Sequence, residues 1–334
     1  MNILLTSVGR RAYMVKYFQE ALKGQGEVHV CNSDEKTVAF HYADKHFISP
    51  LIYDDNYIPF LLKYCSENHI DIVVSLFDMD LLILSKNMGK FEKIGTRVVV
   101  SDSSFIEICN DKWKTYNFLL NNGFHTPKTY LTLKETLNAI DSGKLHYPIV
   151  VKPRFGCGSI ALSIAENEMA LLYFFRKSTR IVNDSYLKYE SSYTDDKIIF
   201  QEFIEGQEYG ADIINDLYGH FRNIVLRKKI AMRAGETDIA EIVEHKILKK
   251  ELIKLGTITH HIANLDCDIF FDNNIAYILE MNARFGGGYP FSHIAGVNLP
   301  LAIINWVKGK DVSDDMLTAN IGTRGFKELY LTSN

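Results

Sequence analysis

The sequence predicts an α/β protein in which a doubly wound, parallel-sheet domain is followed by a two-lobed α+β domain. Three observations support this fold class: short apolar strands alternate with helices over the first hundred residues, the pattern changes near residue 109, and strand-rich runs with turn signals follow residue 197. A length of 334 residues, at roughly 150 per domain, also fits two domains. We therefore expect a first domain at 1–109 and a second domain that begins at residue 110.

The elements of the first domain follow from hydrophobic periodicity. Continuous apolar runs predict buried strands, and apolar positions at helical spacing predict helices. The predicted strands are 2–8, 27–31, 71–76 and 97–100, and the predicted helices are 11–23 and 57–68. Alternation of this kind is typical of a parallel sheet covered by helices on both faces.

The second domain has a different pattern. Helices are predicted around 112–121 and 133–142, before a strand at 148–152. Runs rich in β-branched and aromatic residues predict an antiparallel sheet, and they are 197–204, 207–215 and 220–230. The polar stretch 178–196 is expected to be a mobile loop, and 311–334 carries no motif.

Composition excludes several classes of protein. With 37 basic and 41 acidic side chains the net charge is −4, so no overall field would hold nucleic acid or an anionic membrane, and neither is expected as a partner. The five cysteines form no CxxC pair, which favours a reducing compartment. Because the sequence shows neither an export signal nor a run of 18 apolar residues, we expect a cytoplasmic protein.

Common catalytic and nucleotide motifs are missing. The sequence has no GxxxxGK[ST], HExxH or GxSxG motif. The first strand ends in the residues Ser7-Val8-Gly9-Arg10-Arg11, where a dinucleotide-binding fold would need GxGxxG. NAD binding is therefore not expected.

Four separated segments carry the candidate chemistry. At 151–159 a lysine at a strand end precedes a glycine loop, which would let bare backbone approach a phosphate; a plain tight turn is the alternative. At 200–208 a strand, a turn and a second acid fit a backbone hinge that pairs with an adenine edge while a carboxylate takes ribose hydroxyls; in isolation this is merely a hairpin. At 284–288 an arginine and three glycines supply a cation and exposed N–H groups.

The segment 266–282 carries the sharpest signal. A three-residue loop at 273–275 would place residue 268 opposite residue 280 in an antiparallel hairpin. Period-two alternation then gathers three carboxylates and an amide on one face, namely Asp266, Asp268, Glu280 and Asn282. Such oxygen ligands suit Mg²⁺, which completes its shell with water and substrate phosphates. The alternative is a solvated face with acids at the strand start.

These four segments, in this order and at these separations, resemble the ATP-grasp superfamily. The first 110 residues resemble the Rossmann-like pre-ATP-grasp domain of its carbamoyl phosphate synthetase large-subunit-like branch, so that the resemblance covers about 300 residues. The resemblance implies a first domain at 1–109, a small lobe at 110–202, a large lobe with the metal site at 203–310, and a C-terminal extension at 311–334. It implies that ATP contacts are made by Lys112, Lys152, Gly156, Gly158, Ser159, Glu202, Phe203, Ile204 and Glu208. It also implies that the metal ligands are Asp268, Glu280 and Asn282, and that Arg284 binds phosphate and the reaction intermediate. The hairpin lacks the family's usual glycine, which leaves Asp266 as an alternative to Asp268.

A basic run at 227–236 lies where the family has a strand and loop facing the triphosphate. If the strand alternates regularly, Arg227 and Lys229 share one face. We expect Lys229 to reach the β- and γ-phosphates and Arg233 to lie on a closing loop, both as catalytic residues. A solvated basic strand is the alternative.

The resemblance implies a ligase that activates a carboxylate as an acylphosphate with ATP and joins it to an amine. The implied cofactors are ATP and two Mg²⁺ ions, with Mn²⁺ as a substitute, and the partners are small-molecule carboxylates and amines. A carbamoyl phosphate synthetase-like enzyme acting on bicarbonate and a nucleotide-binding module without turnover are the alternatives. The sequence does not give the oligomeric state, although a homodimer is the commonest closed assembly.

Substrate contacts are the least determined part of the site. Arg10 and Arg11 at a helix start could hold a carboxylate or phosphate, and a surface pair is the alternative. Asp78 and Asp80 follow a strand at a switch-point position and could hold an ammonium group. The backbone N–H of Gly287 is a candidate oxyanion donor.

Overall fold

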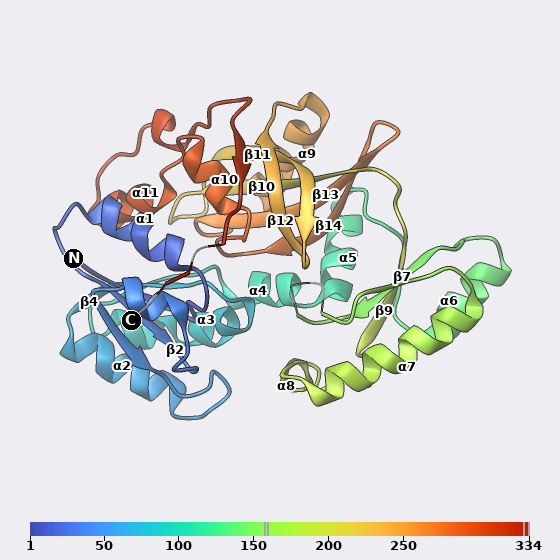
Figure 1. The fold of residues 1–334 in the computed structure, drawn as a ribbon, viewed down its shortest axis with the longest axis horizontal. Helices are drawn as coiled ribbons and strands as arrows, with labels where there is room; N and C mark the ends of the chain where they lie inside the picture. The colour runs from blue at the N-terminus through green and yellow to red at the C-terminus, as the bar shows by residue number, and fades with distance from the viewer. Residues whose placement is uncertain (157, 159, 330, 333–334) are drawn as a thin grey trace.

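Three β-sheets organise the chain. The structure is a computed structural model and describes residues 1–156, 158, 160–329 and 331–332. Figure 1 shows the N-terminal sheet with its helices on the left, a smaller lobe on the right, and a larger sheet above and between them. The predicted α/β class, with an N-terminal parallel sheet and a separate antiparallel part, is confirmed.

The first sheet is parallel and has the strand order β3-β2-β1-β4-β5. Its strands are β1 (Asn2–Thr6), β2 (Val28–Asn32), β3 (Lys45–Ile48), β4 (Ile70–Ser75) and β5 (Arg97–Val99). Its helices are α1 (Ala12–Leu22), the 3₁₀ helix η1 (Val38–Tyr42), α2 (Tyr57–Glu67), α3 (Asp78–Glu92) and α4 (Ser103–Asn110). The strand order reverses between β1 and β4, and the loops after these strands form the edge where such folds bind ligands.

Four elements of this domain were not predicted, namely η1, β3, α3 and α4, and β3 and α3 show why. β3 is a largely exposed edge strand without an apolar run. α3 buries Asp78, Asp80 and Ser85 where a helical pattern would show apolar residues, so its stripe is weak. Both elements are fixed by their partners in the fold.

The second sheet is antiparallel, with the order β14-β13-β10-β11-β12-β15. Its strands are β10 (Gln207–Asn215), β11 (Phe221–Arg233), β12 (Glu236–Ile242), β13 (Asn264–Asp272), β14 (Ile275–Asn282) and β15 (Arg324–Phe326). Its helices are α9 (Lys246–Thr259), α10 (Tyr289–Ile294), α11 (Leu299–Val307) and the 3₁₀ helix η2 (Asp314–Leu317). The C-terminal stretch without a sequence motif thus supplies the edge strand β15, which pairs with β12.

The smaller lobe is built on a four-stranded antiparallel sheet with the order β6-β9-β7-β8. Its strands are β6 (Thr129–Tyr130), β7 (Ile149–Pro153), β8 (Ser163–Ala165) and β9 (Ile198–Glu202), and its helices are α6 (Leu133–Asp141), α7 (Glu168–Asp184) and α8 (Leu187–Glu190). Helix α5 (Lys112–Asn121) precedes them. The expectation that 197–204 joins the same sheet as 207–215 is wrong, because β9 pairs with β7. A strand's apolar run does not specify its partner.

The expectation of a loop at 178–196 is wrong for residues 178–190, which are largely helical, whereas residues 191–196 form turns and irregular backbone. Residues up to Asp184 continue α7, and α8 follows and contacts the N-terminal domain. The polar composition of this stretch reflects helix surface, while Val182 and Leu187 are buried in the lobe's core.

The hydrophobic cores separate the lobe from the rest of the chain. One cluster joins α1 of the first domain to α11, and a second joins β4 and α3 to α9 and the six-stranded sheet. A third cluster lies wholly within residues 130–200 and belongs to the smaller lobe. The first domain and the larger sheet therefore share their packing, whereas the lobe has a hydrophobic core of its own. No helix among the described residues is long and apolar enough to cross a bilayer.

Candidate active site

The acidic hairpin β13–β14 has the predicted register. Asp268 pairs with Glu280 and Asp266 pairs with Asn282. The predicted three-residue loop is wrong, because the turn has two residues, Asn273 and Asn274, both with positive φ. A two-residue turn alone would bring residue 279 opposite Asp268, and a β-bulge between Asp268 and Ile269 restores Glu280 to that position.

Two acids of this hairpin have different surroundings. Asp266 is buried and forms ion pairs with Arg227 and with Arg284, the latter at 3.0 Å. Burial by itself would raise the pKa of Asp266, but these two arginines hold it below its usual value. The side chain of Asp268 is 32% exposed and contacts Lys229 at 2.6 Å. Asp268 therefore faces the open side of the sheet, and Asp266 is enclosed by arginines.

Lys229 lies at the centre of the candidate site. Its Nζ is 2.6 Å from both Asp268 Oδ1 and Glu208 Oε1. Arg227, two residues earlier on β11, is on the same face, as the alternation predicts, because it pairs with Asp212 at 2.6 Å and with Asp266. Burial by itself would lower the pKa of Lys229, but the carboxylates of Asp268 and Glu208 raise it above its usual value. The lysine is thus held charged between two carboxylates.

Glycines let Arg227 lie flat across this face. A Cβ at Gly210 on the neighbouring strand would stand 2.7 Å from the Nε of Arg227, and one at Gly288 would stand 2.2 Å from the same atom. A Cβ at Gly286 would stand 2.2 Å from the Cγ of Asp266. The buried arginine–carboxylate network and the Gly286–Gly288 run therefore require each other.

Two further lysines approach the same acids from the side of the lobe. Lys112 begins α5, its Nζ lies 3.6 Å from Glu280 Oε1, and it donates a hydrogen bond to the carbonyl of Gly156. Lys152, on β7, donates to Gln201 Oε1 at 2.8 Å. Burial lowers the pKa of Lys152 to about 8. Lysines from the lobe and from the larger sheet thus surround one pair of carboxylates.

The glycine loop follows β7. Gly156 has φ +92° and Gly158 has φ +71°, both in the left-handed region. A Cβ at Gly156 would meet Leu187 at 2.4 Å. Ser159, predicted to contact phosphate, lies outside the described residues.

The predicted hinge joins the two antiparallel sheets. β9 ends at Glu202 and β10 begins at Gln207, so Phe203 and Ile204 lie between the sheets. The carboxylate of Glu202 accepts a hydrogen bond from the backbone N–H of Lys128 at 3.1 Å. Glu208, the predicted ribose acid, comes next on β10 and pairs with Lys229.

Arg284 connects the site to the first domain. Its guanidinium contacts Asp78 and Asp266, each at 3.0 Å, and its side chain is buried. The structure thus brings this predicted phosphate-binding arginine to the acid hairpin, where two carboxylates fix it. Asp78, predicted to hold an ammonium group, instead binds this guanidinium.

Arg233 is not brought to the other site residues. It is exposed at the end of β11 and pairs with Asp238, near the turn formed by Ala234 and Gly235. A Cβ at Gly287 would come 3.9 Å from Glu236 and 4.0 Å from Lys327. Arg233 therefore lies at the tip of the β11–β12 hairpin, with Gly287 near Glu236 of the same hairpin, and its assignment to a closing loop stays a prediction.

The predicted substrate contacts divide into three cases. Arg10 is exposed and Arg11 is half-buried, with its Nη1 donating to the carbonyls of Leu76 and, at 2.9 Å, of Phe285. Asp80 is fully buried and accepts hydrogen bonds from four hydroxyls, those of Thr6, Ser7, Tyr57 and Ser75. The predicted substrate contact of Asp80 is wrong, because its carboxylate is inaccessible to solvent and already accepts these four hydrogen bonds.

Sequence reasoning missed two members of the site. Asp212 is fully buried beneath Arg227, and Gln201 holds Lys152. The signal for Asp212 was present, since Glu208, Gly210 and Asp212 alternate on a strand predicted at 207–215. Gln201 had no comparable signal, because its role depends on β9 lying beside β7.

The side chains of the hairpin would supply only some of the ligands of a magnesium ion. Among the described residues, no three histidine, cysteine, aspartate or glutamate side chains already form a metal-binding group. Asp268, Glu280 and Asn282 nevertheless share one face. The pKa of Asp268 is raised, mainly by burial. The neighbouring carboxylates of Asp266 and Glu280 also raise it, whereas Lys229 lowers it. Carboxylate and amide oxygens of this number suit an ion that completes its octahedron with water and phosphate oxygens.

A parallel-sheet domain, a smaller lobe with its own antiparallel sheet, and lysines that converge on paired acids define the ATP-grasp class of fold. The chain belongs to the ATP-grasp family: the ATP-grasp domain matches residues 109–288, and the PylC-like N-terminal domain matches residues 3–99. The carbamoyl phosphate synthase large chain of Xylella fastidiosa (strain Temecula1 / ATCC 700964) is 21% identical over 310 residues. That match covers 87% of this chain and 27% of the relative, so the chain spans about a quarter of the relative's length.

Solved structures share the fold. The L-amino acid ligase of Bacillus licheniformis superposes with a TM-score of 0.73 at 18% identity, covering 96% of this chain and 78% of that one. The biotin carboxylase domain of the 2-oxoglutarate carboxylase of Hydrogenobacter thermophilus, a dimer in complex with MgADP, ADP and bicarbonate, gives a TM-score of 0.73 at 15% identity, covering 96% and 72%. The resemblance inferred from the four sequence segments is confirmed.

Proposed function

We propose that this chain is an ATP-dependent ligase that activates a carboxylate as an acylphosphate and joins it to an amine, releasing ADP and phosphate. The observation that carries the proposal is the pairing of Asp268 with Glu280 between Lys229 on one side and Lys112 on the other. Phosphoryl transfer needs positioning and charge neutralisation more than a nucleophilic side chain. This arrangement supplies both.

The ion pairs of the site are suited to a change of partners. Lys229 lies between Glu208 and Asp268, and Lys112 lies beside Glu280. When the phosphates of ATP arrive, they replace the carboxylates as partners of the lysines. The carboxylates then become available, Glu208 for the ribose hydroxyls and the other two for metal.

The residues that would hold Mg²⁺ are Asp268, Glu280 and Asn282. The metal would neutralise charge on the phosphates during transfer and would complete its shell with phosphate oxygens. We propose Asp268 in place of Asp266 because Arg227 and Arg284 already pair with the Asp266 carboxylate. Two ions, and replacement by Mn²⁺, remain part of the proposal.

The other contacts follow from position. Phe203 and Ile204 on the hinge would face adenine with backbone groups, with Glu202 beside them. Lys112, Lys152 and Lys229, with the N–H groups of Gly156, Gly158 and Ser159, would hold the phosphates.

A carboxylate oxygen of the substrate attacks the γ-phosphorus, and the bond to the β-phosphate oxygen breaks to give ADP. The amine then attacks the acyl carbon, phosphate leaves, and the amine loses a proton. Arg284 and the N–H of Gly287 would stabilise charge on the acyl oxygen. Arg233 would approach the phosphates only if the hairpin tip moved.

The remaining parts of the proposal concern setting and assembly. A cytoplasmic location is supported by four cysteines that are free and buried among the described residues, Cys31, Cys65, Cys109 and Cys267. The partners would be a small-molecule carboxylate and an amine. A homodimer is the proposed assembly.

Release of ADP and phosphate from Mg²⁺-ATP tests the function. Purified protein is incubated with pooled carboxylates and amines, and hydroxylamine is added in parallel to trap an acylphosphate as a hydroxamate. Carboxylate-dependent ADP release with hydroxamate is the expected result. ATP binding without release from any pool contradicts the ligase reaction, and transfer of labelled bicarbonate into the product would favour the carbamoyl phosphate synthetase-like alternative.

Binding of Mg²⁺-ATP should be accompanied by proton uptake near pH 8. The pKa of Lys152 is about 8, so about half of these side chains are neutral at that pH, and a neighbouring phosphate favours the charged form. We expect an uptake of about half a proton at pH 8 and much less at pH 7. Titration calorimetry in buffers of different ionisation enthalpy measures it.

Lys152→Arg provides the control for proton uptake. An arginine stays charged at both pH values, so the dependence of the binding enthalpy on the buffer should disappear at pH 8. An equal uptake in the variant and the wild type would show that another group titrates.

A further inference from the structure

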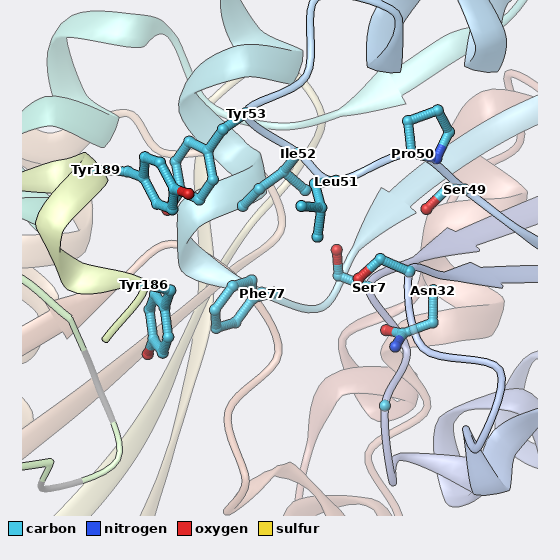
Figure 2. A pocket seen from close by; sticks show the side chains of 12 residues that line it. Ser7, Asn32, Ser49, Pro50, Leu51, Ile52, Tyr53, Phe77, Tyr186 and Tyr189 are labelled. Carbon is cyan, nitrogen blue, oxygen red and sulfur yellow. The ribbon is translucent and has the colours of Figure 1, made fainter. Parts of the chain in front are cut away.

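A cavity of about 350 Å³ lies between the N-terminal domain and helix α8 of the lobe. Figure 2 shows Ser7, Asn32 and Ser49 on one side of it, at the ends of β1, β2 and β3, with Phe77 and Tyr186 opposite. The carboxyl ends of parallel strands near a reversal of strand order are where such sheets bind ligands. The volume is within the ~300–1,000 Å³ range of small-molecule sites.

The walls of the cavity are uncharged. Among the described residues, no acidic or basic side chain lines it. Leu51, Ile52 and Phe77 give it apolar surface, while Ser49 and Asn32 contribute polar groups. Within the described part of the chain the Asn32 carboxamide has no hydrogen-bond partner, so both its donor and its acceptor are available to a ligand. Such walls suit a flat, uncharged group that carries a hydrogen-bonding atom.

Aromatic contacts across the cavity tie the lobe to the first domain. The rings of Tyr53 and Tyr189 stack with centroids 4.6 Å apart, and Tyr53 Oη donates to Glu190 at 2.9 Å. Phe77 and Tyr186 meet edge to face at 6.0 Å. Figure 2 shows both pairs on the side of the cavity that the lobe covers. A ligand inside is therefore enclosed only while the lobe rests on the first domain.

The cavity adjoins the candidate active site. Phe77 lines it, and the next residue, Asp78, forms the ion pair with Arg284. Gly9 also lines it, and the next residue, Arg10, is exposed and has no ion-pair partner within the described residues. Because Arg284 is already paired with Asp78 and Asp266, the cation available beside the other end of a molecule that fills the cavity is Arg10.

We infer that the cavity holds the side chain of the carboxylate substrate, and that this side chain is an aromatic or heteroaromatic ring bearing a hydrogen-bonding group. The ring packs among Leu51, Ile52 and Phe77, its polar group meets Asn32, and the carboxylate lies on the side of Arg10 and the active site. The inference rests on the proposed ligase function, which requires a carboxylate substrate.

Direct binding tests the inference without turnover. Wild-type protein with Mg²⁺-ADP is titrated with 3-(4-hydroxyphenyl)propanoate and with indole-3-propanoate, and hexanoate serves as the acid without a ring. We expect the ring acids to bind at least tenfold more tightly than hexanoate. Leu51→Trp, which fills the cavity from an exposed position, should weaken the ring acids at least tenfold, and Asn32→Ala should weaken them roughly three- to tenfold. Affinity for Mg²⁺-ADP should stay unchanged in both variants.

Leu120→Trp is the matched control, because Leu120 is likewise exposed and does not line the cavity. Equal binding of ring acids and hexanoate, or equal binding of ring acids to Leu51→Trp and wild type, overturns the inference. If only acids without rings support ADP release, the inference fails and the ligase function stands. If ring acids bind but no mixture releases ADP, the ligase function fails, and with it the assignment of the cavity to a substrate.

Discussion

Glu280→Gln should lower the rate of carboxylate-dependent ADP release by at least ~100-fold, because it removes one of two acids proposed to hold the metal. The substitution keeps the size of the side chain but removes the charge opposite Asp268 and beside Lys112. Steady-state measurement of ADP release at saturating Mg²⁺-ATP gives the effect. Because Glu280 is 23% exposed at its side chain, the fold should tolerate the change.

Glu244→Gln is the matched control for this prediction. Glu244 is exposed and pairs with Lys249 at 3.1 Å, so the same change removes an ion pair outside the site. Its rate should equal that of the wild type. A Glu280→Gln enzyme that retains full activity would contradict the metal assignment, and restoration of activity by higher Mg²⁺ would indicate that only metal affinity was lost.

Arg227→Met should destabilise the folded chain by about 3–5 kcal/mol, because it leaves buried carboxylates without their partner. Arg227 is 1% exposed and joins Asp212 to Asp266. Urea titration followed by tryptophan fluorescence measures the change in the free energy of unfolding, and Trp306, one of two tryptophans, lies in the core shared with the first domain. Arg324→Met is the control, because its pair with Glu241 is exposed and should contribute about 0–1 kcal/mol.

The same variant should show a changed dependence of stability on pH. In the wild type the pKa of Asp266 is lowered, so its stabilising contribution is present above the unfolded pKa of ~4 and is lost as the pH falls through the folded value. Without Arg227, the buried charges of Asp212 and Asp266 destabilise the folded state, and protonation of these carboxylates removes that destabilisation. The difference in the free energy of unfolding between variant and wild type should therefore be largest at pH 7 and should become smaller below about pH 4. A gap that stays constant would show that the loss comes from packing.

Periodicity and spacing were enough to predict the local features of this protein. The alternation of strands and helices predicted the parallel sheet, and β10 was predicted with the bounds that the structure gives it. Alternation along β13 and β14 predicted that Asp268 and Glu280 share a face, and alternation along β11 predicted the same for Arg227 and Lys229. These properties depend on neighbours along the chain, and a sequence records those neighbours directly.

Only the tertiary structure decided which segments meet. It placed β9 beside β7 in the lobe, paired Arg284 with Asp78 over 206 positions of the chain, and enclosed Asp80 among hydroxyls. It also turned the polar stretch after residue 178 into helices that cover a cavity of the first domain. The sequence shows that a buried hydrophobic or charged residue must contact a partner, but the packing of the whole chain determines which residue that partner is. The sequence by itself therefore determined the sheet class and the shared faces of the site residues on β11, β13 and β14, and packing decided which charges are neutralised inside and which remain available to a substrate.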